Sequence, residues 1–302
     1  MKKLIIAAGT GFLGKVLVNH FANKCEEIII LTRGSSKTTH HVRYVHWDAK
    51  TLSGWEAELE NASVLINLAG KSVDCRYTTK NKKEILSSRV DSTKILNEAV
   101  LLCKNPPKHW LNSSTSTIYR FSLDKQMTEK NGEIGNDFSM NVAKAWEKTF
   151  FETKTLRTLK TALRTSIVLG KNGGAFLPLK RLTQCGLGGK QGNGNQLISW
   201  IHEKDFARAV AFIIEKELID VVNIVSPQPI SNANFMSKLQ KQLQIPIAIS
   251  TPTLLLKFGA KIIGTEPELV LKSRNVIPDK LINSGFEFEF NTLEETLKNV
   301  AQ

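Results

Sequence analysis

The opening residues constrain the fold more than any other part of the chain. An apolar run, LIIAA, leads into the glycine turn GTGFLG, and a second apolar run, EIIILTR, ends at Arg33. Between the two runs, apolar residues recur at helical spacing at Val16, Leu17, Val18 and Phe21. Strand, turn, helix and strand in this order, with nearly continuous apolar strands, predict a parallel βαβ unit covered on both faces.

The same alternation continues along the chain. Further strands are expected at residues 44–47, 63–70, 109–114, 161–169 and 221–226, and helices at 82–103 and 140–154. Strands and helices in alternation predict an α/β fold, a Rossmann-type doubly wound parallel sheet with right-handed crossovers.

The composition changes after Gly170. A glycine-rich connection over about 171–197 is too long for a simple crossover, and such loops often cover a site. Beyond it the chain is mainly helical, with prolines at 246, 252, 267 and 278 as breaks. We therefore expect an NAD(P)-binding domain at 1–225 and a smaller C-terminal substrate-capping lobe at 226–302.

The net charge restricts the ligand class. The chain has 41 basic and 28 acidic residues, a formal charge of +13, which attracts phosphate-bearing ligands such as nucleotides, sugar nucleotides or nucleic acids. The basic residues are scattered, so a generally basic solvated surface is an open alternative.

Other classes are excluded by what the sequence lacks. Its four cysteines stand far apart without a CxxC pair, which argues against a disulfide framework and a metal site. The short apolar run at the start does not have the length of a signal peptide, and no later stretch has the uncharged span that a bilayer requires. We expect a cytoplasmic protein with no membrane partner.

The glycine turn carries the first prediction of a ligand. Ala8, Gly11 and Gly14 occupy the three positions of a dinucleotide-binding turn, in which glycine lets the backbone approach a pyrophosphate at the start of the helix. Ala8 stands where the first glycine is usual, and an alanine should be tolerated there if its φ is negative, since Gly9 sits beside it. A turn kept glycine-rich only for packing is the alternative.

The end of the second strand indicates which dinucleotide binds. An acidic residue there would bind the ribose hydroxyl of NAD, whereas an arginine receives the 2′-phosphate of NADP. This chain has Arg33, Ser35, Ser36 and Lys37 and no acid. Guanidinium pairs bidentately with phosphate, so we expect NADP(H) in preference to NAD(H). An exposed arginine that touches nothing is the alternative.

Several motifs together resemble one family. They are GTGFLG at 9–14, LTR at 31–33, Trp47-Asp48, NLAG at 67–70, SRVDST at 88–93, Trp146-Glu147, LRTSIVLG at 163–170, SWIHEKD at 199–205 and the C-terminal VIPDKLINSGF. With them, nearly the whole chain resembles the extended short-chain dehydrogenases/reductases, in particular the YfcH-like branch of sugar-nucleotide epimerases.

The resemblance implies a set of cofactor residues. By matching position, Asp48 contacts the adenine amino group, the 67–70 segment lines the nicotinamide ribose, and Arg164 with Thr165 lies at the far end of the cofactor. The resemblance also implies a homodimer formed through two helices. The full set of expected cofactor-binding residues is Gly9, Thr10, Gly11, Phe12, Leu13, Gly14, Arg33, Asp48, Asn67, Leu68, Ala69, Gly70, Ser113, Ser114 and Arg164.

The usual acid/base pair of that family is missing. Ordinary members use Tyr-x-x-x-Lys, in which the lysine lowers the tyrosine pKa. Here Ser139 and Ala143 occupy those positions, and Lys144 would point about 100° away on a helix.

Other residues are candidates for the missing chemistry. Thr115 matches the family's catalytic Ser/Thr, and Tyr119 could donate a proton beside it. Arg76, Tyr77 and His202 are candidate substrate-binding residues. For Thr115, Tyr119 and His202, a purely structural role with satisfied hydrogen bonds is an equal alternative.

Three functions follow. The first is an atypical NADP-dependent epimerase or oxidoreductase that acts on a sugar nucleotide or another small polar substrate. The second is an NADP(H)-sensing binding protein without turnover, favoured by the missing pair. The third is a nucleic-acid binder, which only the net charge favours and which lacks a basic stretch interleaved with aromatic residues.

Overall fold

A computed structural model describes residues 1–39, 42–264 and 266–301, and its centre is an eight-stranded sheet. The strand order is β12-β7-β6-β5-β1-β2-β4-β3, in which every neighbouring pair is parallel except β3 with β4. The order reverses between β1 and β5, which confirms the Rossmann-type fold and places the crevice for a ligand at the carboxyl ends of these strands. The strands are β1 Lys3–Ala7, β2 Glu27–Thr32, β3 Lys37–Thr39, β4 Val42–His46, β5 Val64–Asn67, β6 His109–Thr115, β7 Leu159–Thr165 and β12 Asp220–Ile224.

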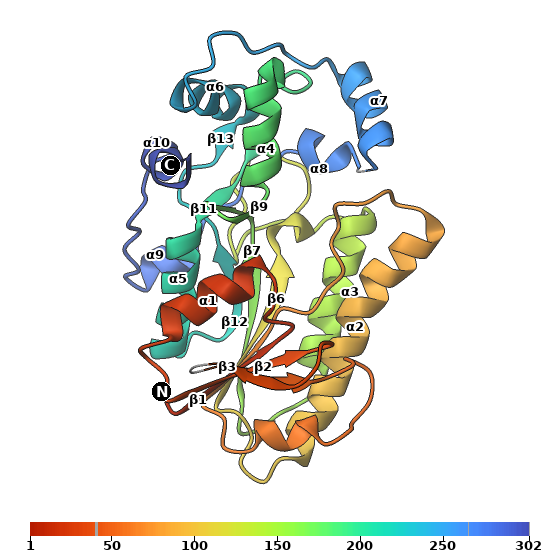
Figure 1. Cartoon of the computed structure of the whole chain (residues 1–302), viewed down its shortest axis with the longest axis vertical. Coiled ribbons are helices and arrows are strands. Elements are labelled where there is room, and N and C mark those ends of the chain that lie inside the picture. Colours follow the sequence, from red (N-terminus) through yellow and green to blue (C-terminus); the bar gives the residue numbers. More distant parts are fainter. Residues whose placement is uncertain (40–41, 265, 302) are drawn as a thin grey trace.

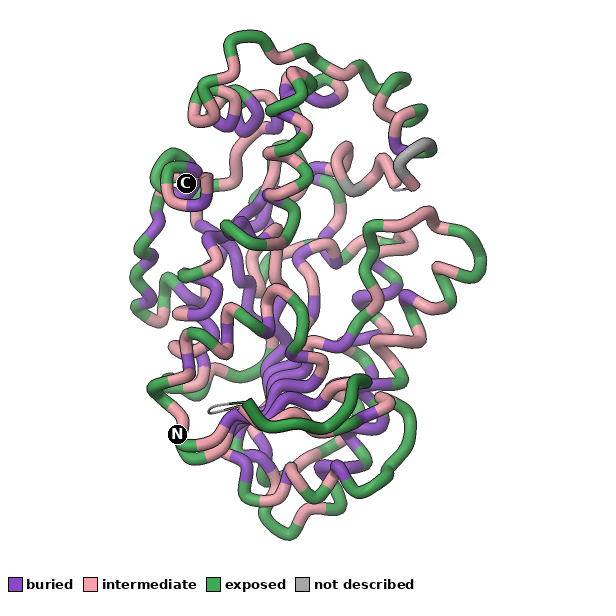
Figure 2. Tube along the Cα trace, viewed as in Figure 1, coloured by how far each residue is buried: buried purple, intermediate pink, exposed green. Residues whose placement is uncertain are grey.

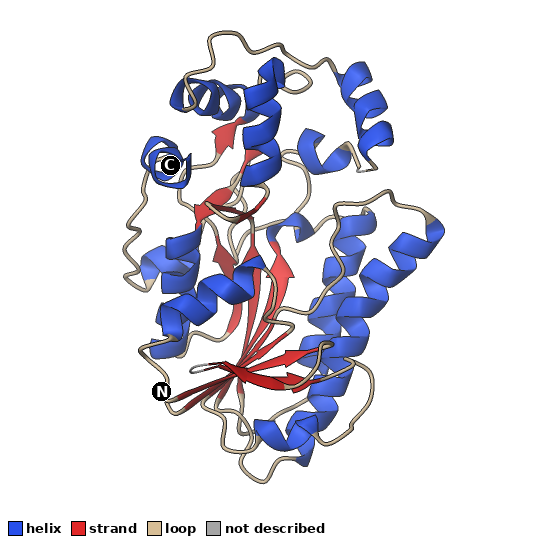
Figure 3. Ribbon diagram, in the orientation of Figure 1, coloured by secondary structure: helices blue, strands red, loops and turns tan. Residues whose placement is uncertain are grey.

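Helices cover both faces of the sheet (Figures 1 and 3). On one face α1 (Phe12–Phe21) and α5 (Glu203–Glu215) pack on an apolar cluster that includes Ile6 and Val222. On the other face lie α2 (Thr79–Leu102) and α3 (Phe138–Glu152), with the 3-10 turn η1 (Trp55–Leu59) at one end. The strands between these layers are the most deeply buried part of the chain (Figure 2).

A helical C-terminal lobe sits beyond the ends of β6 and β7 (Figure 1). Its core joins Phe176 and Trp200 to Phe235 and Leu297, so the glycine-rich segment packs with this lobe. Among the described residues, no helix combines the length and apolar character needed to cross a bilayer. The helices of the lobe are α4 Phe176–Leu182, α6 Asn232–Gln242, α7 Thr253–Ile263, α8 Glu268–Leu271 and α10 Leu293–Ala301. Helix α9 (Asp279–Asn283) lies instead beside β12, and its Leu281 belongs to the apolar cluster under α1 and α5 (Figure 1).

Three features differ from the sequence predictions. The apolar run 161–169 is not one strand, because Ser166 separates β7 from β8 (Ile167–Gly170), which leaves the large sheet and pairs with β11 (Trp200–His202). The glycine-rich segment contains the helix α4. Pro178 does not prevent this helix, because it lies in the first turn, where a backbone N–H would have no helical partner. The short edge strand β3 is polar and exposed, so no apolar pattern marks it.

Candidate functional site

The turn between β1 and α1 is closely packed at two glycines. A Cβ atom on Gly14 would lie 2.0 Å from the Gly9 carbonyl oxygen, and a Cβ atom on Gly9 would lie 2.8 Å from Ile6 Cγ2. Both distances are below van der Waals contact, so α1 can approach β1 this closely only without these side chains. Packing therefore explains Gly9 and Gly14.

Packing does not explain Gly11. Its backbone is extended, with φ −78° and ψ −175°, and a Cβ atom on it would meet nothing within 4 Å. It precedes α1 without a side-chain cap, and Thr10 and Gly11 are exposed. The first N–H groups of the helix therefore have open space beside them, which is the arrangement that binds a phosphate group.

The next two residues face inward. The ring of Phe12 packs against Gly173. A Cβ atom on Gly173 would lie 2.4 Å from Phe12 Cδ2, so the ring fits only because this residue is a glycine. Leu13 packs against the apolar cluster below α1. The side chains of Phe12 and Leu13 thus fix the helix in place, and only backbone groups of this part of the turn can contact a ligand.

Ala8 does not meet the condition under which we expected an alanine to be tolerated here. Its φ is +57°, in the left-handed region, and its N–H donates to the Leu31 carbonyl oxygen at 2.8 Å. The hydrogen bond to the neighbouring strand holds Ala8 in a conformation that costs a residue with a Cβ atom about 1–2 kcal/mol. Glycine would adopt it without that cost, so Gly9 beside it does not relieve the turn.

Arg33 follows β2 in a turn that its neighbours fasten. The Gly34 N–H donates to Thr32 Oγ1 at 3.1 Å, and the His46 N–H donates to Ser36 Oγ at 2.9 Å. Arg33 itself is exposed, and no ion pair to it occurs within the described ranges. Its guanidinium stands at the carboxyl edge of the sheet, available to an anionic ligand.

Asp48 uses its carboxylate locally. Oδ1 accepts from the N–H groups of Lys50 at 2.8 Å and Thr51 at 2.9 Å, and Oδ2 accepts from Thr51 Oγ1 at 2.8 Å. These bonds, led by that from the Thr51 N–H, lower the pKa of Asp48. An adenine amino group would have to share an acceptor with this turn.

The segment after β5 is shaped by Asn67. This buried amide donates to Asn112 Oδ1 at 2.7 Å and accepts from the Ala69 N–H at 3.0 Å. The Leu68 N–H donates to the Ala7 carbonyl oxygen at 3.0 Å, and Ala69 is buried. Of these four expected ligand-contact residues only Gly70 is exposed. Asn67, Leu68 and Ala69 hold the backbone that carries it.

Tyr119 does not fit the catalytic role that we expected. Its side chain is 1% exposed, and its hydroxyl donates to Asn223 Oδ1 at 2.9 Å while accepting from Arg164 Nη1 at 2.8 Å. Burial raises the pKa of Tyr119, and Arg164 opposes that shift. Both hydrogen-bonding capacities of the hydroxyl are therefore used within the protein.

Arg164 and Ser114 belong to the same internal network. Arg164 forms a two-pronged ion pair with Glu147, at 2.8 and 2.7 Å, and Ser114 Oγ donates to Glu147 Oε1 at 2.6 Å. The network ties β6 and β7 to α3, and all three side chains are largely buried. A contact of Arg164 or Ser114 with the cofactor does not fit this arrangement, whereas Ser113 beside them is partly exposed.

His202 is also internal. Its ring is 1% exposed and stacks on Phe290 at 3.6 Å between centroids. Nε2 lies 3.0 Å from Asn299 Oδ1, and Nδ1 accepts from the Lys204 N–H at 3.0 Å, which caps α5. Burial lowers the pKa of His202. The residue fastens the C-terminal segment to α5 and does not fit our substrate-binding expectation.

The carboxyl end of β6 meets the start of α3. Thr115 is partly exposed, and its Oγ1 accepts from the Thr117 N–H at 3.1 Å, so its own proton is free for another acceptor. Ala143 is buried in the core and Lys144 is exposed, so neither supplies a charge beside Ser139. Ser139 Oγ donates instead to Glu268 Oε1 of α8 at 2.9 Å.

Tyr77 lies beside Ser139. Its ring contacts that of Phe138, with 4.9 Å between centroids, and its backbone N–H donates to Glu266 Oε1 at 2.7 Å. Glu266 also lies 3.3 Å from Arg76 Nη1, so both predicted substrate-binding residues of this loop are held by the C-terminal lobe. The Tyr77 hydroxyl is buried and forms no hydrogen bond of standard geometry within the described part of the chain, although the Ser139 hydroxyl is near enough to oppose the rise in its pKa.

Two arginines near Tyr77 were missed in the sequence. Arg89 Nη1 donates to the carbonyl oxygens of Lys71 and Ile85, and its guanidinium lies 5.1 Å from the Trp146 ring centre. Burial lowers the pKa of Arg89 to about 10, and burial also lowers that of Arg274. Neither forms an ion pair with any described carboxylate. The two arginines stand alone in the sequence, one on a helix and one in a loop, so no local pattern indicates that the fold brings both close to Tyr77.

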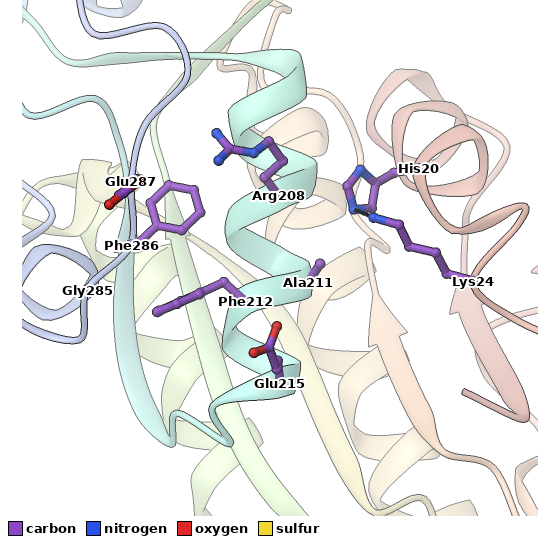
Figure 4. A pocket seen from close by; sticks show the side chains of 9 residues that line it. All are labelled: His20, Lys24, Arg208, Ala211, Phe212, Glu215, Gly285, Phe286 and Glu287. Atoms are coloured by element: carbon purple, nitrogen blue, oxygen red, sulfur yellow. Dashed lines mark hydrogen bonds between the residues drawn. The ribbon is translucent and has the colours of Figure 1, made fainter.

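A separate surface pocket lies away from the strand ends (Figure 4). It opens between α1 and α5, and its basic side chains have partners: Lys24 Nζ lies 2.8 Å from His20 Nε2, and Arg208 Nη1 lies 2.6 Å from Asp205 Oδ1. Burial, with Lys24 next, lowers the pKa of His20. This pocket is not part of the crevice at β1 and β5.

Comparisons with known proteins agree with this geometry. The family model described as the NAD dependent epimerase/dehydratase family matches residues 4–140, and a domain of unknown function, DUF1731, matches residues 251–300. The epimerase family protein YfhF of Bacillus subtilis is 31% identical over 302 residues, which cover 98% of this chain and 97% of that protein.

Solved structures give the same relationship. The human epimerase family protein SDR39U1 (isoform 2), crystallised with NADPH, is 27% identical with a TM-score of 0.88 over 99% of both chains. A nucleoside-diphosphate sugar epimerase from Corynebacterium glutamicum is 26% identical with a TM-score of 0.77, over 98% of this chain and 58% of that one. The chain described here belongs to the NAD-dependent epimerase/dehydratase family.

Proposed function

We propose that this protein is an NADP(H)-dependent epimerase or oxidoreductase of the YfcH-like branch, with a sugar nucleotide or another small polar molecule as substrate. The observation that carries the proposal is the open, uncapped start of α1 at Gly11, on the same sheet edge as the exposed Arg33. A phosphate group at each place matches the two phosphate-bearing parts of NADP(H). The NADPH-bound human relative supports this choice.

The residues divide into those that touch the cofactor and those that support them. Backbone N–H groups at the start of α1 would hold the pyrophosphate, Arg33 the 2′-phosphate, and Gly70 the nicotinamide ribose. When bound, the nicotinamide would supply reversible hydride transfer. Thr115 would donate its free hydroxyl proton to a substrate oxygen, and Ser113 would line the same edge. We leave Tyr119, Arg164 and His202 out of these roles.

A sensor without turnover is the second candidate. The observation that favours it is the replacement of the Tyr-x-x-x-Lys pair by Ser139 and Ala143. The lysines that do lie at the start of α3 come from other elements: Lys272 pairs with Asp137, and Lys82 lies over the Phe138 ring. Such a protein would bind NADP(H) at the same residues. We also propose a cytoplasmic homodimer; light scattering in solution would test the dimer.

Cofactor titration tests the proposal. Energy transfer from tryptophan to NADPH or NADH reports each dissociation constant, and we expect tighter binding of NADPH. Arg33→Ala should weaken NADPH binding by about 10- to 100-fold, the value of a charge-assisted bond of about 1.5–3 kcal/mol, and leave NADH unchanged. Equal affinity of the native protein for both cofactors would contradict the role of Arg33.

Turnover separates the two candidates. An NADPH-consuming reaction with nucleotide-sugar or small carbonyl substrates would support the enzyme, and Thr115→Val should reduce it without changing NADPH affinity. Tight NADPH binding without consumption across such substrates would favour the sensor.

A further inference from the structure

The Tyr77 hydroxyl is the unusual group of the substrate side. A buried hydroxyl without a partner costs free energy, and buried polar groups are ordinarily hydrogen-bonded. Tyr77 nevertheless keeps its hydroxyl in this position, while Phe138 and Glu266 fix its ring and its backbone. The Ser139 hydroxyl lies close enough to oppose the rise in the pKa of Tyr77, but no hydrogen bond of standard geometry to a described residue satisfies the phenol, so it is organised for a partner that the protein itself does not provide.

The place of this hydroxyl carries the chemistry. Ser139, on α3, stands where ordinary family members have their acid/base tyrosine, and its hydroxyl is the neighbour that opposes the raised pKa of Tyr77. The phenol therefore comes from the loop before α2 rather than from α3, but it reaches the same end of the helix. A phenol thus lies beside the position at which the resemblance expects one, although it comes from another element.

Positive charge accompanies the phenol. Arg89 lies beside Gly70, since a Cβ atom there would be 3.1 Å from Arg89 Cζ, and a negative charge on Tyr77 would raise the pKa of both Arg89 and Arg274. Neither guanidinium is neutralised by an ion pair with a described carboxylate. These positive groups favour the phenolate form, which is the role of the missing lysine, whereas Glu266 and Glu268 oppose it.

We infer that Tyr77 is the proton donor of the reaction, with Arg89 and Arg274 stabilising the phenolate that it leaves behind. The inference rests on the proposed function. In the reductive direction the carbonyl carbon gains the hydride that the reduced cofactor supplies. The carbonyl oxygen takes the proton from Tyr77 Oη, the O–H bond of the phenol breaks, and the product is an alcohol. Solvent returns a proton to the phenolate, and the reverse direction uses the same groups.

The charges around Tyr77 decide its protonation state in the absence of cofactor. Burial is the main cause of the raised pKa of Tyr77, so the phenol is protonated at neutral pH, as a proton donor must be. The groups that act on it are Ser139, Glu268, Cys75, Glu266, Arg89 and Arg274.

The test is an ultraviolet titration of tyrosine in the full-length protein. The chain has only three tyrosines, so each phenolate signal can be assigned with Tyr77→Phe and Tyr44→Phe. NADP⁺ carries a positive nicotinamide and NADPH a neutral one. A phenol at the reacting end should therefore titrate at lower pH with NADP⁺ than with NADPH, by about one pH unit. Circular dichroism at each pH shows the range over which the fold is intact.

We expect this shift in the native protein and in Tyr44→Phe, and its loss in Tyr77→Phe. Arg89→Gln should move the Tyr77 titration to higher pH, and Ser139→Ala provides a second variant at the same place. If both cofactors bind fully but no tyrosine responds to NADP⁺, Tyr77 is not the proton donor, although the proposed function stands. If neither cofactor binds, both the proposed function and the role of Tyr77 are contradicted.

Discussion

The turn after β1 and the cluster around Tyr77 are the two parts of the proposed site, and they are built in different ways. The turn consists of consecutive residues whose backbone does the work, and Gly9 and Gly14 are there because a side chain would not fit. The cluster consists of side chains from α2, the start of α3 and the C-terminal lobe. Its members have no pattern in common along the chain. A backbone site is thus specified by consecutive residues, whereas a side-chain cluster depends on the packing that brings its members together.

The largest effect should separate packing from binding within the turn. Gly14→Ala places a methyl group 2.0 Å from the Gly9 carbonyl oxygen, so we expect destabilisation of about 3 kcal/mol or more and loss of NADPH binding. Gly11→Ala is the matched control, because its methyl group meets nothing. Its free energy of unfolding should change by less than about 0.5 kcal/mol, while NADPH affinity falls at least about tenfold. Urea unfolding and fluorescence titration measure both quantities.

Equal destabilisation by the two alanine substitutions would show that Gly11 is also a packing residue. Unchanged NADPH affinity in Gly11→Ala would contradict the binding of the pyrophosphate beside Gly11.

The next effect compares two tyrosines. Tyr119→Phe removes a hydroxyl that bonds to Arg164 and Asn223 and leaves both buried groups short of a partner, so stability should fall by about 1–3 kcal/mol. Tyr77→Phe removes a hydroxyl without a partner and should leave stability unchanged or slightly higher. Thermal unfolding of the two variants side by side distinguishes them. A large loss in Tyr77→Phe would indicate a structural hydroxyl there.

The smallest effect concerns Ala8. Glycine adopts a φ of +57° without the Cβ penalty, but it also loses more conformational freedom on folding. We expect Ala8→Gly to stabilise the fold by less than about 1 kcal/mol, measured by urea unfolding, with NADPH affinity preserved. A marked loss of stability would mean that the Ala8 methyl group packs usefully despite its backbone conformation.

The same difference between local and long-range requirements explains which parts of the fold the sequence predicted. The sheet, its order-reversing centre and most helices could be predicted because buried parallel strands are continuous apolar runs and each helix has a 3.6-residue period. The glycine turn could be predicted because its requirements are local. The left-handed φ of Ala8 could not, because it depends on a hydrogen bond to Leu31 in the next strand.

The side chains of the site were harder to predict for the same reason. Position along a strand placed Arg164 and Tyr119 near the crevice, but whether they face it depends on Glu147 and Asn223, which are brought in from α3 and β12. The place of Tyr77 after β5 could be predicted, but Ser139 and Arg89 become its neighbours only once α2 and α3 pack together, and Arg274 only once the segment after α8 folds back.

A crystal structure of the protein with NADPH supplied would be the most direct test. We predict density for the pyrophosphate within hydrogen-bond distance of the first N–H groups of α1, beside Gly11, and for the 2′-phosphate against Arg33. A crevice that stays empty at saturating NADPH, or that is filled by the protein's own side chains, would contradict the proposed function.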